Sequence, residues 1–147
     1  MVRINSDNAC SDSNFAAARL LLGQADVQAG KYDDAVNQLR RAATLAGDSP
    51  PCTRAQVGVA LAAAGRTHEA TDIADTLQRA SAQRYVSPYG LAQIYAAMQR
   101  EDDTFKWLRG AYEGRAVWMG YLAVDPVFDR YRADRRLQEL VRQMGLR

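Results

Sequence analysis

Apolar and polar positions follow one another along this chain with the spacing of amphipathic helices. Between positions 32 and 46 the apolar residues that share one helical face are Ala35, Val36, Leu39, Ala42 and Ala43. The stretch LAQIYAAMQREDDTFKWLRGAY at 91–112 shows helical spacing on both sides of a polar break, QREDD. This pattern predicts an all-α chain in which short helices are paired as hairpins.

Small residues recur along the chain at intervals of 34 or 35 positions. Three sets have this interval: Gly23, Ala35 and Ala42; Gly58, Ala70 and Leu77; and Ala92, Thr104 and Ala111. A period between 20 and 50 residues is typical of stacked units that cannot bury their apolar faces alone. The chain is therefore expected to be a short solenoid of three units.

Glycine, proline and capping residues indicate where the helices begin and end. The first unit is expected to contain helices from about Ser13 to Ala29 and from Tyr32 to Ala46, with a loop at 47–51. In the second unit, Thr53 and Gln56 have capping-box spacing. Gly65 is expected to form the next turn, and Thr67 to cap a helix that reaches about Ala82. Further helix starts are expected at Ser87 followed by Pro88, at Asp125 followed by Pro126, and at Asp134.

The repeat resembles the tetratricopeptide repeat family, which places small residues where the two helices of a unit approach most closely. Seven of the nine residues in the three sets are Gly or Ala, and Leu22, Val57 and Leu91 match a neighbouring apolar position of that family. The resemblance implies a right-handed solenoid of three antiparallel helix pairs at about 16–50, 51–84 and 85–116. These pairs make up residues 13–116, between a polar N-terminal extension at 1–12 and a C-terminal capping segment at 117–147.

The resemblance also implies a concave groove that is lined by the first helix of each pair. Carried over position by position, its lining residues are Leu20, Gln24, Val27, Ala55, Val59, Ala62, Tyr89, Gln93 and Ala96. This lining contains no cation of the kind that grips a peptide's terminal carboxylate. We expect a small, apolar and neutral groove that accepts a partner helix or an extended segment.

The last sixty residues resemble the terminal part of tetratricopeptide regions in bacterial signalling proteins, including the VDP-x-FD-x-x-R-x-D sequence at 124–134. Such regions often follow DNA-binding, nucleotide-cyclase or kinase domains. A solenoid must also cover the apolar face of its last unit. The residues expected to provide that cover are Trp118, Tyr121, Leu122, Phe128, Tyr131, Leu137, Leu140 and Val141.

Composition narrows the function classes. The 147 residues carry 19 basic and 17 acidic side chains, so the net charge of +2 gives no strong field for nucleic acid or for a membrane surface. Cys10 and Cys52 form no metal-binding motif or disulfide framework, and no metal or cofactor is expected. No targeting or membrane-spanning segment is predicted, and a cytoplasmic location is the simplest expectation.

Candidate chemical groups have simpler structural interpretations. A lone His68 at a helix start is typical of a solvated side chain, and the acids at 101–103 suit the N-terminal end of a helix dipole. Trp107, Trp118 and Tyr121 could surround a cation, although their helical spacing favours the core. The clustered basic residues are expected to form a solvated, ion-paired face: Arg130, Arg132, Arg135 and Arg136.

These observations predict a protein–protein interaction module that binds a peptide or partner helix in its groove, and no enzyme, because no nucleophile or acid–base pair stands out. The resemblance adds that it could be the regulatory C-terminal part of a bacterial signalling protein. The alternative is a structural, self-associating domain whose groove is filled by another copy or by a neighbouring domain. A homo-oligomer therefore stays possible.

Overall fold

The computed structural model describes the backbone of residues 6–46 and 51–146 and the side chains of residues 16–46 and 53–146. Throughout these residues the chain is helical and has no strand, so the all-α class is confirmed for them. The elements are α1 (Ser6–Gln28), α2 (Tyr32–Ala46), α3 (Pro51–Ala63), α4 (Thr67–Ala80), α5 (Pro88–Ala97), α6 (Glu101–Glu113), the 3₁₀ helices η1 (Val117–Tyr121) and η2 (Pro126–Tyr131), and α7 (Arg135–Gln143).

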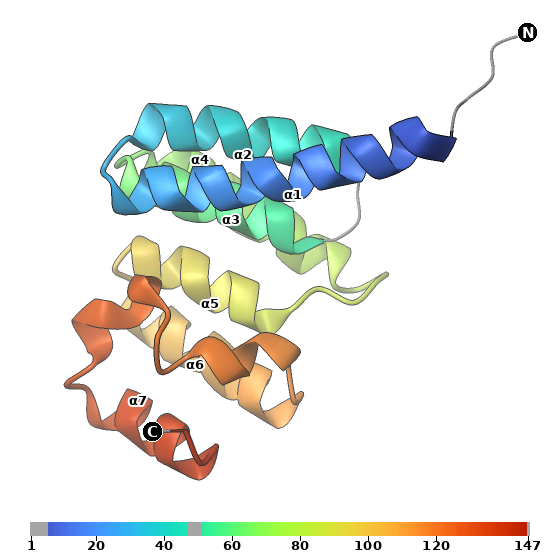
Figure 1. Cartoon of the computed structure of the whole chain (residues 1–147). Coiled ribbons are helices and arrows are strands. Elements are labelled where there is room, and N and C mark those ends of the chain that lie inside the picture. Colours follow the sequence, from blue (N-terminus) through green and yellow to red (C-terminus); the bar gives the residue numbers. More distant parts are fainter. Residues whose placement is uncertain (1–5, 47–50, 147) are drawn as a thin grey trace, which may run out of the picture.

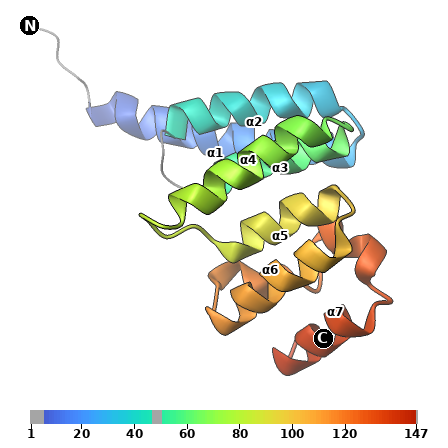
Figure 2. The ribbon, with the colours of Figure 1, turned by 180° about the vertical axis from the view of Figure 1, so that it is seen from behind.

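Helices that follow one another in sequence pack against each other as pairs: α1 with α2, α3 with α4, and α5 with α6. The pairs are joined by contacts of α3 with both α2 and α5. Figure 1 shows α1 and α2 above α5 and α6, with the segments at 117–131 beside α5 and α6 and α7 at the bottom of the view. Seen from behind, α4 lies in front of α3 (Figure 2).

The turn inside each pair has the same backbone geometry. Gly30, Gly65 and Gln99 have φ angles of 75°, 78° and 61°, in the left-handed region. At each turn two backbone amides donate to carbonyls three and five residues earlier, with N···O distances of 2.9 to 3.1 Å, which is the Schellman arrangement. The glycine turns predicted at 30 and 65 are confirmed. In the third pair Gln99 occupies this position despite its Cβ, at a cost of about 1 kcal/mol.

The nine small positions of the repeat are all buried. Ideal Cβ atoms built on the glycines show how close the helices are. A Cβ at Gly23 would lie 2.5 Å from Leu39 Cγ on α2, its partner in the pair. One at Gly58 would lie 3.1 Å from Ile73 Cγ2 on its partner α4 and 2.8 Å from Ile94 Cδ1 on α5 of the next pair. The contact role that the sequence pattern predicted for these positions therefore agrees with their burial.

The N-terminal boundary differs from the prediction. Helix α1 begins at Ser6 and not near Ser13, so helix occupies residues 6–12 of the region predicted as a polar extension, and the remainder of 1–12 lies outside the described residues. The polar composition of this stretch gave no sign of the helix.

Two predicted helix starts are wrong. Helix α3 begins at Pro51, so Thr53 lies within its first turn and cannot cap it. Thr67 is the first residue of α4, and the capping position belongs to Arg66, which makes no side-chain capping bond. The left-handed turn at Gly65 fixes where α4 begins, because a single residue, Arg66, separates that turn from the helix. Helix α4 also ends at Ala80, two residues before the predicted end.

The starts predicted in the C-terminal half agree with the structure. Ser87 is the N-cap of α5 with Pro88 behind it, although the serine side chain makes no capping bond. Asp125 caps η2 by accepting a hydrogen bond from Val127 N at 3.1 Å. Asp134 caps α7 by accepting one from Arg136 N at 2.8 Å.

The VDP-x-FD-x-x-R-x-D sequence holds together residues 117–134, which contain η1 and η2 and which we call the closure. The Arg132 guanidinium donates to the backbone oxygens of Leu122 and Asp125, both at 2.8 Å, and also pairs with Asp129. Phe128 is completely buried and meets the Tyr89 ring of α5 edge-on, with 5.6 Å between the ring centroids. The pattern therefore has a structural explanation: it fastens η1 and η2 to each other and to α5.

The predicted cover is only partly correct. Its buried members are Leu122, Phe128, Tyr131 and Leu137, and Leu140 and Val141 pack partly buried beside them. Trp118 and Tyr121 are exposed. In a 3₁₀ helix residues three apart share a face, so residues 119 and 122 point inward while 118 and 121 point outward together. The prediction placed Trp118 and Tyr121 in the core because it assumed the 3.6-residue spacing of an α-helix.

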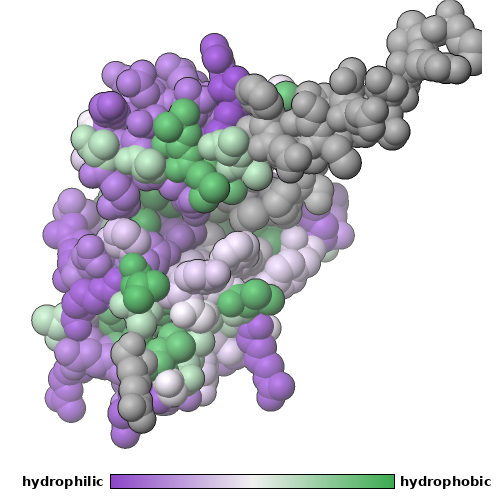
Figure 3. All heavy atoms as spheres, in the orientation of Figure 1, coloured by the Kyte–Doolittle hydropathy of each residue, from purple (hydrophilic) through white to green (hydrophobic). Residues whose placement is uncertain are grey.

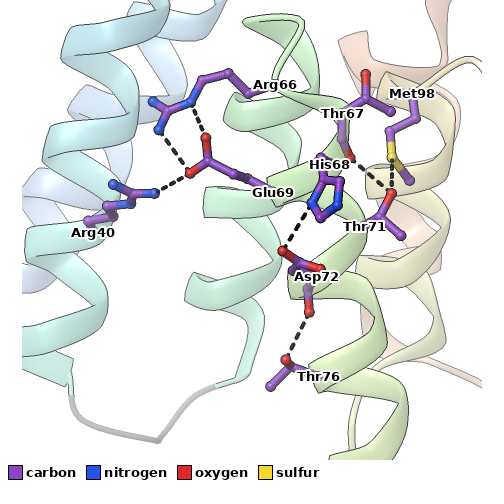
Figure 4. Close-up of polar contacts among 9 residues, drawn as sticks. All are labelled: Arg40, Arg66, Thr67, His68, Glu69, Thr71, Asp72, Thr76 and Met98. Atoms are coloured by element: carbon purple, nitrogen blue, oxygen red, sulfur yellow. Dashed lines mark hydrogen bonds and ion pairs between the residues drawn. The ribbon is translucent and has the colours of Figure 1, made fainter.

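Polar contacts tie the first two pairs together near α2 and α4 (Figure 4). Glu69 on α4 accepts a hydrogen bond from Arg66 Nε at 2.6 Å and one from Arg40 Nη2 of α2 at 3.0 Å. The Arg66 hydrogen bond lowers the pKa of Glu69, with a smaller contribution from Arg40. This side of the molecule is thus occupied by exposed ion pairs.

Candidate functional site

A cavity of about 570 Å³ opens between α1, α3, α5 and the C-terminal 3₁₀ segments; we call it the central cavity. Its described lining residues are Leu20, Leu21, Gln24, Ala25, Val27, Gln28, Gln56, Val59, Ser87, Tyr89, Gly90, Gln93, Trp118, Tyr121, Val124, Asp125, Pro126 and Val127. Figure 3 shows apolar residues on this face both over α1 and over the C-terminal segments. The cavity is therefore bounded by the first helix of every pair and by the closure.

Six of the nine residues predicted for the groove line the central cavity: Leu20, Gln24, Val27, Val59, Tyr89 and Gln93. Ala55, Ala62 and Ala96 are buried and are not among its lining residues. An ideal Cβ at Gly90 would lie 2.9 Å from the Ala55 Cβ, which shows how closely α5 packs on α3 there. The small size of Ala55 therefore serves helix contact.

A chain of hydrogen bonds crosses the wall of the cavity. Gln56 Nε2 donates to Gln93 Oε1 at 2.9 Å, linking α3 to α5. Gln93 Nε2 donates to Asp125 Oδ2 at 2.8 Å, and the Tyr89 hydroxyl donates to the same oxygen at 2.7 Å. These bonds join two stacked pairs and the closure, so the shape of the cavity is fixed from both sides.

The neutral lining expected from the sequence is wrong, because Asp125 adds a carboxylate to it. Burial raises the pKa of the Tyr89 hydroxyl, and the nearby charge of Asp125 raises it further. The hydroxyl therefore stays protonated and donates to Asp125 over the physiological pH range. Sequence reasoning identified Asp125 as a helix cap but had no signal for its contacts with residues 32 and 36 positions earlier.

The rim of the cavity is apolar and exposed. Leu21 on α1 is 67% exposed, and on the closure Trp118 and Tyr121 are 46% and 56% exposed. The Trp118 and Tyr121 rings lie 5.6 Å apart at an angle of 34°. Exposed large apolar side chains around a hollow mark a surface suited to contact with another molecule.

The other candidates show no comparable arrangement. The His68 side chain is 93% exposed, with Asp72 at 3.4 Å as its acidic neighbour (Figure 4). Of the C-terminal arginines, Arg136 pairs with Glu101 and Asp134, and its guanidinium carbon lies 4.0 Å from the Phe105 ring centroid. The ion-paired interpretation is confirmed for Arg136 and for Arg132. Cys10 and Cys52 have side chains outside the described ones.

A second cavity of about 550 Å³ lies between α6 and α7. Its lining mixes charges of both signs, including Arg109, Glu113, Arg135, Arg136 and Glu139. It contains none of the residues predicted for the groove. Such a surface suits solvent and ion pairs, so the central cavity is the stronger candidate.

Comparison of the chain with protein-family models, with curated proteins and with solved structures finds no match in any of the three. Among the described residues, no helix has the length and apolar character needed to cross a membrane. A search of the same residues finds no cluster of His, Cys, Asp and Glu suited to a metal ion. The geometry of the central cavity therefore carries the functional argument.

Proposed function

We propose that this chain is a protein-interaction module of the tetratricopeptide type, which binds a segment of a partner protein in the central cavity. The observation that carries the proposal is the convergence of six predicted groove residues on one cavity with an exposed apolar rim. The internal repeat, the repeated Schellman turns and the buried small residues support the solenoid part of the proposal. Catalysis is not part of it.

Binding in such a cavity is driven by burial of apolar surface at the rim. Leu20 and Leu21 contribute aliphatic surface, and Trp118 and Tyr121 contribute rings. The glutamines of the wall can bond to the polar backbone of an extended segment. The resemblance of the last sixty residues supports a regulatory role within a bacterial signalling protein as an extension of the same proposal.

The test uses a displayed library of random peptides of about twelve residues, selected on the full chain. Peptides that bind the cavity should lose affinity about tenfold or more with Leu21→Glu, because this exposed position tolerates the change in the free protein but places a charge in the contact. Leu45→Glu is the matched control, since Leu45 is an exposed leucine of α2 outside the cavity. Failure to select any peptide sensitive to Leu21→Glu contradicts the proposal.

Self-association is the second candidate, and the exposed apolar rim is the observation that favours it. Sedimentation at several protein concentrations separates the two. A dimer that dissociates with Leu21→Glu, and that competes with selected peptides, would assign the cavity to a second copy of the chain. A monomer at every concentration leaves the cavity open to a different protein.

A further inference from the structure

The formal charge in the lining of the central cavity is of one sign, negative. Among its described lining residues Asp125 is the one with a formal charge, and every other lining side chain is apolar, aromatic, amide or hydroxyl. Asp125 accepts three hydrogen bonds, and all come from uncharged donors: the Tyr89 hydroxyl, the Gln93 amide and Val127 N. Hydrogen bonds of this kind hold the carboxylate in place without removing its negative charge.

Arg132 is a cation that lies close to this turn, but its guanidinium has other contacts. It donates to the backbone oxygens of Leu122 and Asp125, and its ion pair is with Asp129. The Arg132 charge is thus shared with a carboxylate that lies outside the cavity lining. The wall of the cavity keeps the net negative character that Asp125 gives it.

Two rings line the same cavity as this carboxylate. Asp125 N donates to Tyr121 O at 2.8 Å, so the rim ring and the carboxylate belong to one turn of the chain. Trp118 packs against Tyr121, and both rings are about half exposed. Faces of Trp and Tyr attract cations, by roughly 0.5–2 kcal/mol depending on how far the cation is desolvated.

We propose that the central cavity recognises an apolar segment of a partner protein that carries a lysine or arginine. The apolar side chains pack on Leu20 and Leu21, and the cation lies over Trp118 and Tyr121, within reach of Asp125. This inference rests on the proposed function and specifies the chemistry of the partner.

Charge complementarity decides between the possible occupants. An acidic segment would bring a like charge against Asp125, and a purely apolar segment would remove water from that carboxylate without supplying a compensating cation. A basic residue avoids the like-charge repulsion and supplies the compensating cation. The aliphatic stem of lysine or arginine can also lie along the apolar rim while its charged end meets the rings.

The experiment uses the displayed peptide library selected on the full chain, followed by synthesis of the tightest peptide sensitive to Leu21→Glu. Lysine and arginine should be enriched over aspartate and glutamate among the selected peptides. Replacing the basic residue with norleucine, which keeps the stem and removes the charge, should weaken binding about tenfold in calorimetry. Equal or tighter binding of the norleucine peptide overturns the inference.

Substitutions in the protein test where the cation of the peptide binds. Asp125→Asn and Trp118→Leu should each shrink the difference in affinity between the lysine and norleucine peptides. The matched controls are Asp72→Asn, which removes the same charge from an exposed position of α4 outside the cavity, and Tyr112→Leu, an exposed ring on α6. Both controls should preserve the difference. Thermal melting checks that each variant folds, and if Asp125→Asn does not fold, Trp118→Leu alone decides.

The outcomes separate this inference from the function on which it rests. Peptides that bind the cavity irrespective of charge overturn the inference and leave the proposed function standing. Absence of any peptide sensitive to Leu21→Glu overturns both. A second copy of the chain that competes with every peptide overturns the inference in favour of self-association.

Discussion

The two hydrophobic cores of this molecule are built from different side chains, although α5 contributes to both. The first core joins α2, α3, α4 and α5 and consists mainly of alanine and valine, with Tyr95 as its aromatic member. The second joins α5, α6, η1, η2 and α7 and contains four aromatic residues: Tyr89, Phe105, Phe128 and Tyr131. Close helix approach holds the first core together, whereas the second core is filled with rings.

This difference predicts opposite weaknesses. Close approach leaves no room for added atoms, so the first core should be most sensitive to small-to-large substitutions. A core built around rings loses most when a ring is removed, because the cavity left behind is large. The four predictions below test the contrast from the largest expected effect to the smallest.

Phe128→Ala should lower the free energy of unfolding by about 3–5 kcal/mol, because Phe128 is fully buried and packs edge-on against Tyr89. Urea denaturation followed by circular dichroism measures it. Tyr121→Ala, at an exposed ring of the same closure, should change stability by less than about 0.5 kcal/mol. Similar losses for the two variants would contradict the assignment of Phe128 to the core of the closure.

Ala35→Leu and Ala70→Leu should each destabilise the protein by about 1–3 kcal/mol, because both alanines are fully buried where paired helices meet. The same denaturation experiment applies. Ala18→Leu, at an exposed position of α1, is the control and should be nearly neutral. Unchanged midpoints for both buried variants would show that the small residues of the repeat do not set helix approach.

Gln99→Gly should stabilise the protein by about 0.5–1 kcal/mol, because glycine adopts the positive φ of this turn without the Cβ penalty. Gly65→Ala, at the equivalent turn of the second pair, should destabilise by a similar amount. Melting temperatures of the two variants would therefore move in opposite directions. A decrease for both would mean that the Gln99 side chain contributes contacts that outweigh its backbone strain.

Acid should loosen α7 before the rest of the molecule. The hydrogen bond from the Arg136 side chain holds the pKa of Asp134 below its ordinary value of 3.8, and the Arg136 backbone amide lowers it further. A lowered folded-state pKa stabilises the folded form above pH 3.8, and this contribution is lost as the pH falls through the lower folded-state value.

Amide NMR signals of α7 during acid titration would report this loosening. Asp134→Ser keeps a capping oxygen but has no carboxyl group to titrate, so its α7 should respond less to acid over the same range. Identical acid profiles for the native chain and Asp134→Ser would contradict a role for the Asp134 carboxylate in this response.

Local signals in the sequence were enough for the helix pairs. The period of small residues located their contact positions, and Gly30 and Gly65 located two of the turns because glycine accepts a positive φ. The third turn was harder, since Gln99 carries no such signal. The capping threonines misled because a capping-box spacing also occurs by chance within a helix, as at Thr53.

Contacts between distant positions were beyond the sequence pattern. The family resemblance gave nine groove residues, of which six on α1, α3 and α5 line the central cavity, but it could not separate Ala55 from Val59, since both are buried on α3. The exposed rings of Trp118 and Tyr121 depend on a 3₁₀ helix, which has no strong sequence signature. The role of Asp125 depends on bonds to Tyr89 and Gln93 that only the folded chain brings together.

Chemical-shift mapping of a selected peptide on the labelled protein tests the central claim most directly. The account predicts that the largest changes fall on α1, α3, α5 and η1, with the Trp118 indole signal among them, and that α2 and α4 change little. Largest changes on α2 and α4, or in the cavity between α6 and α7, would show that the central cavity is not the binding site.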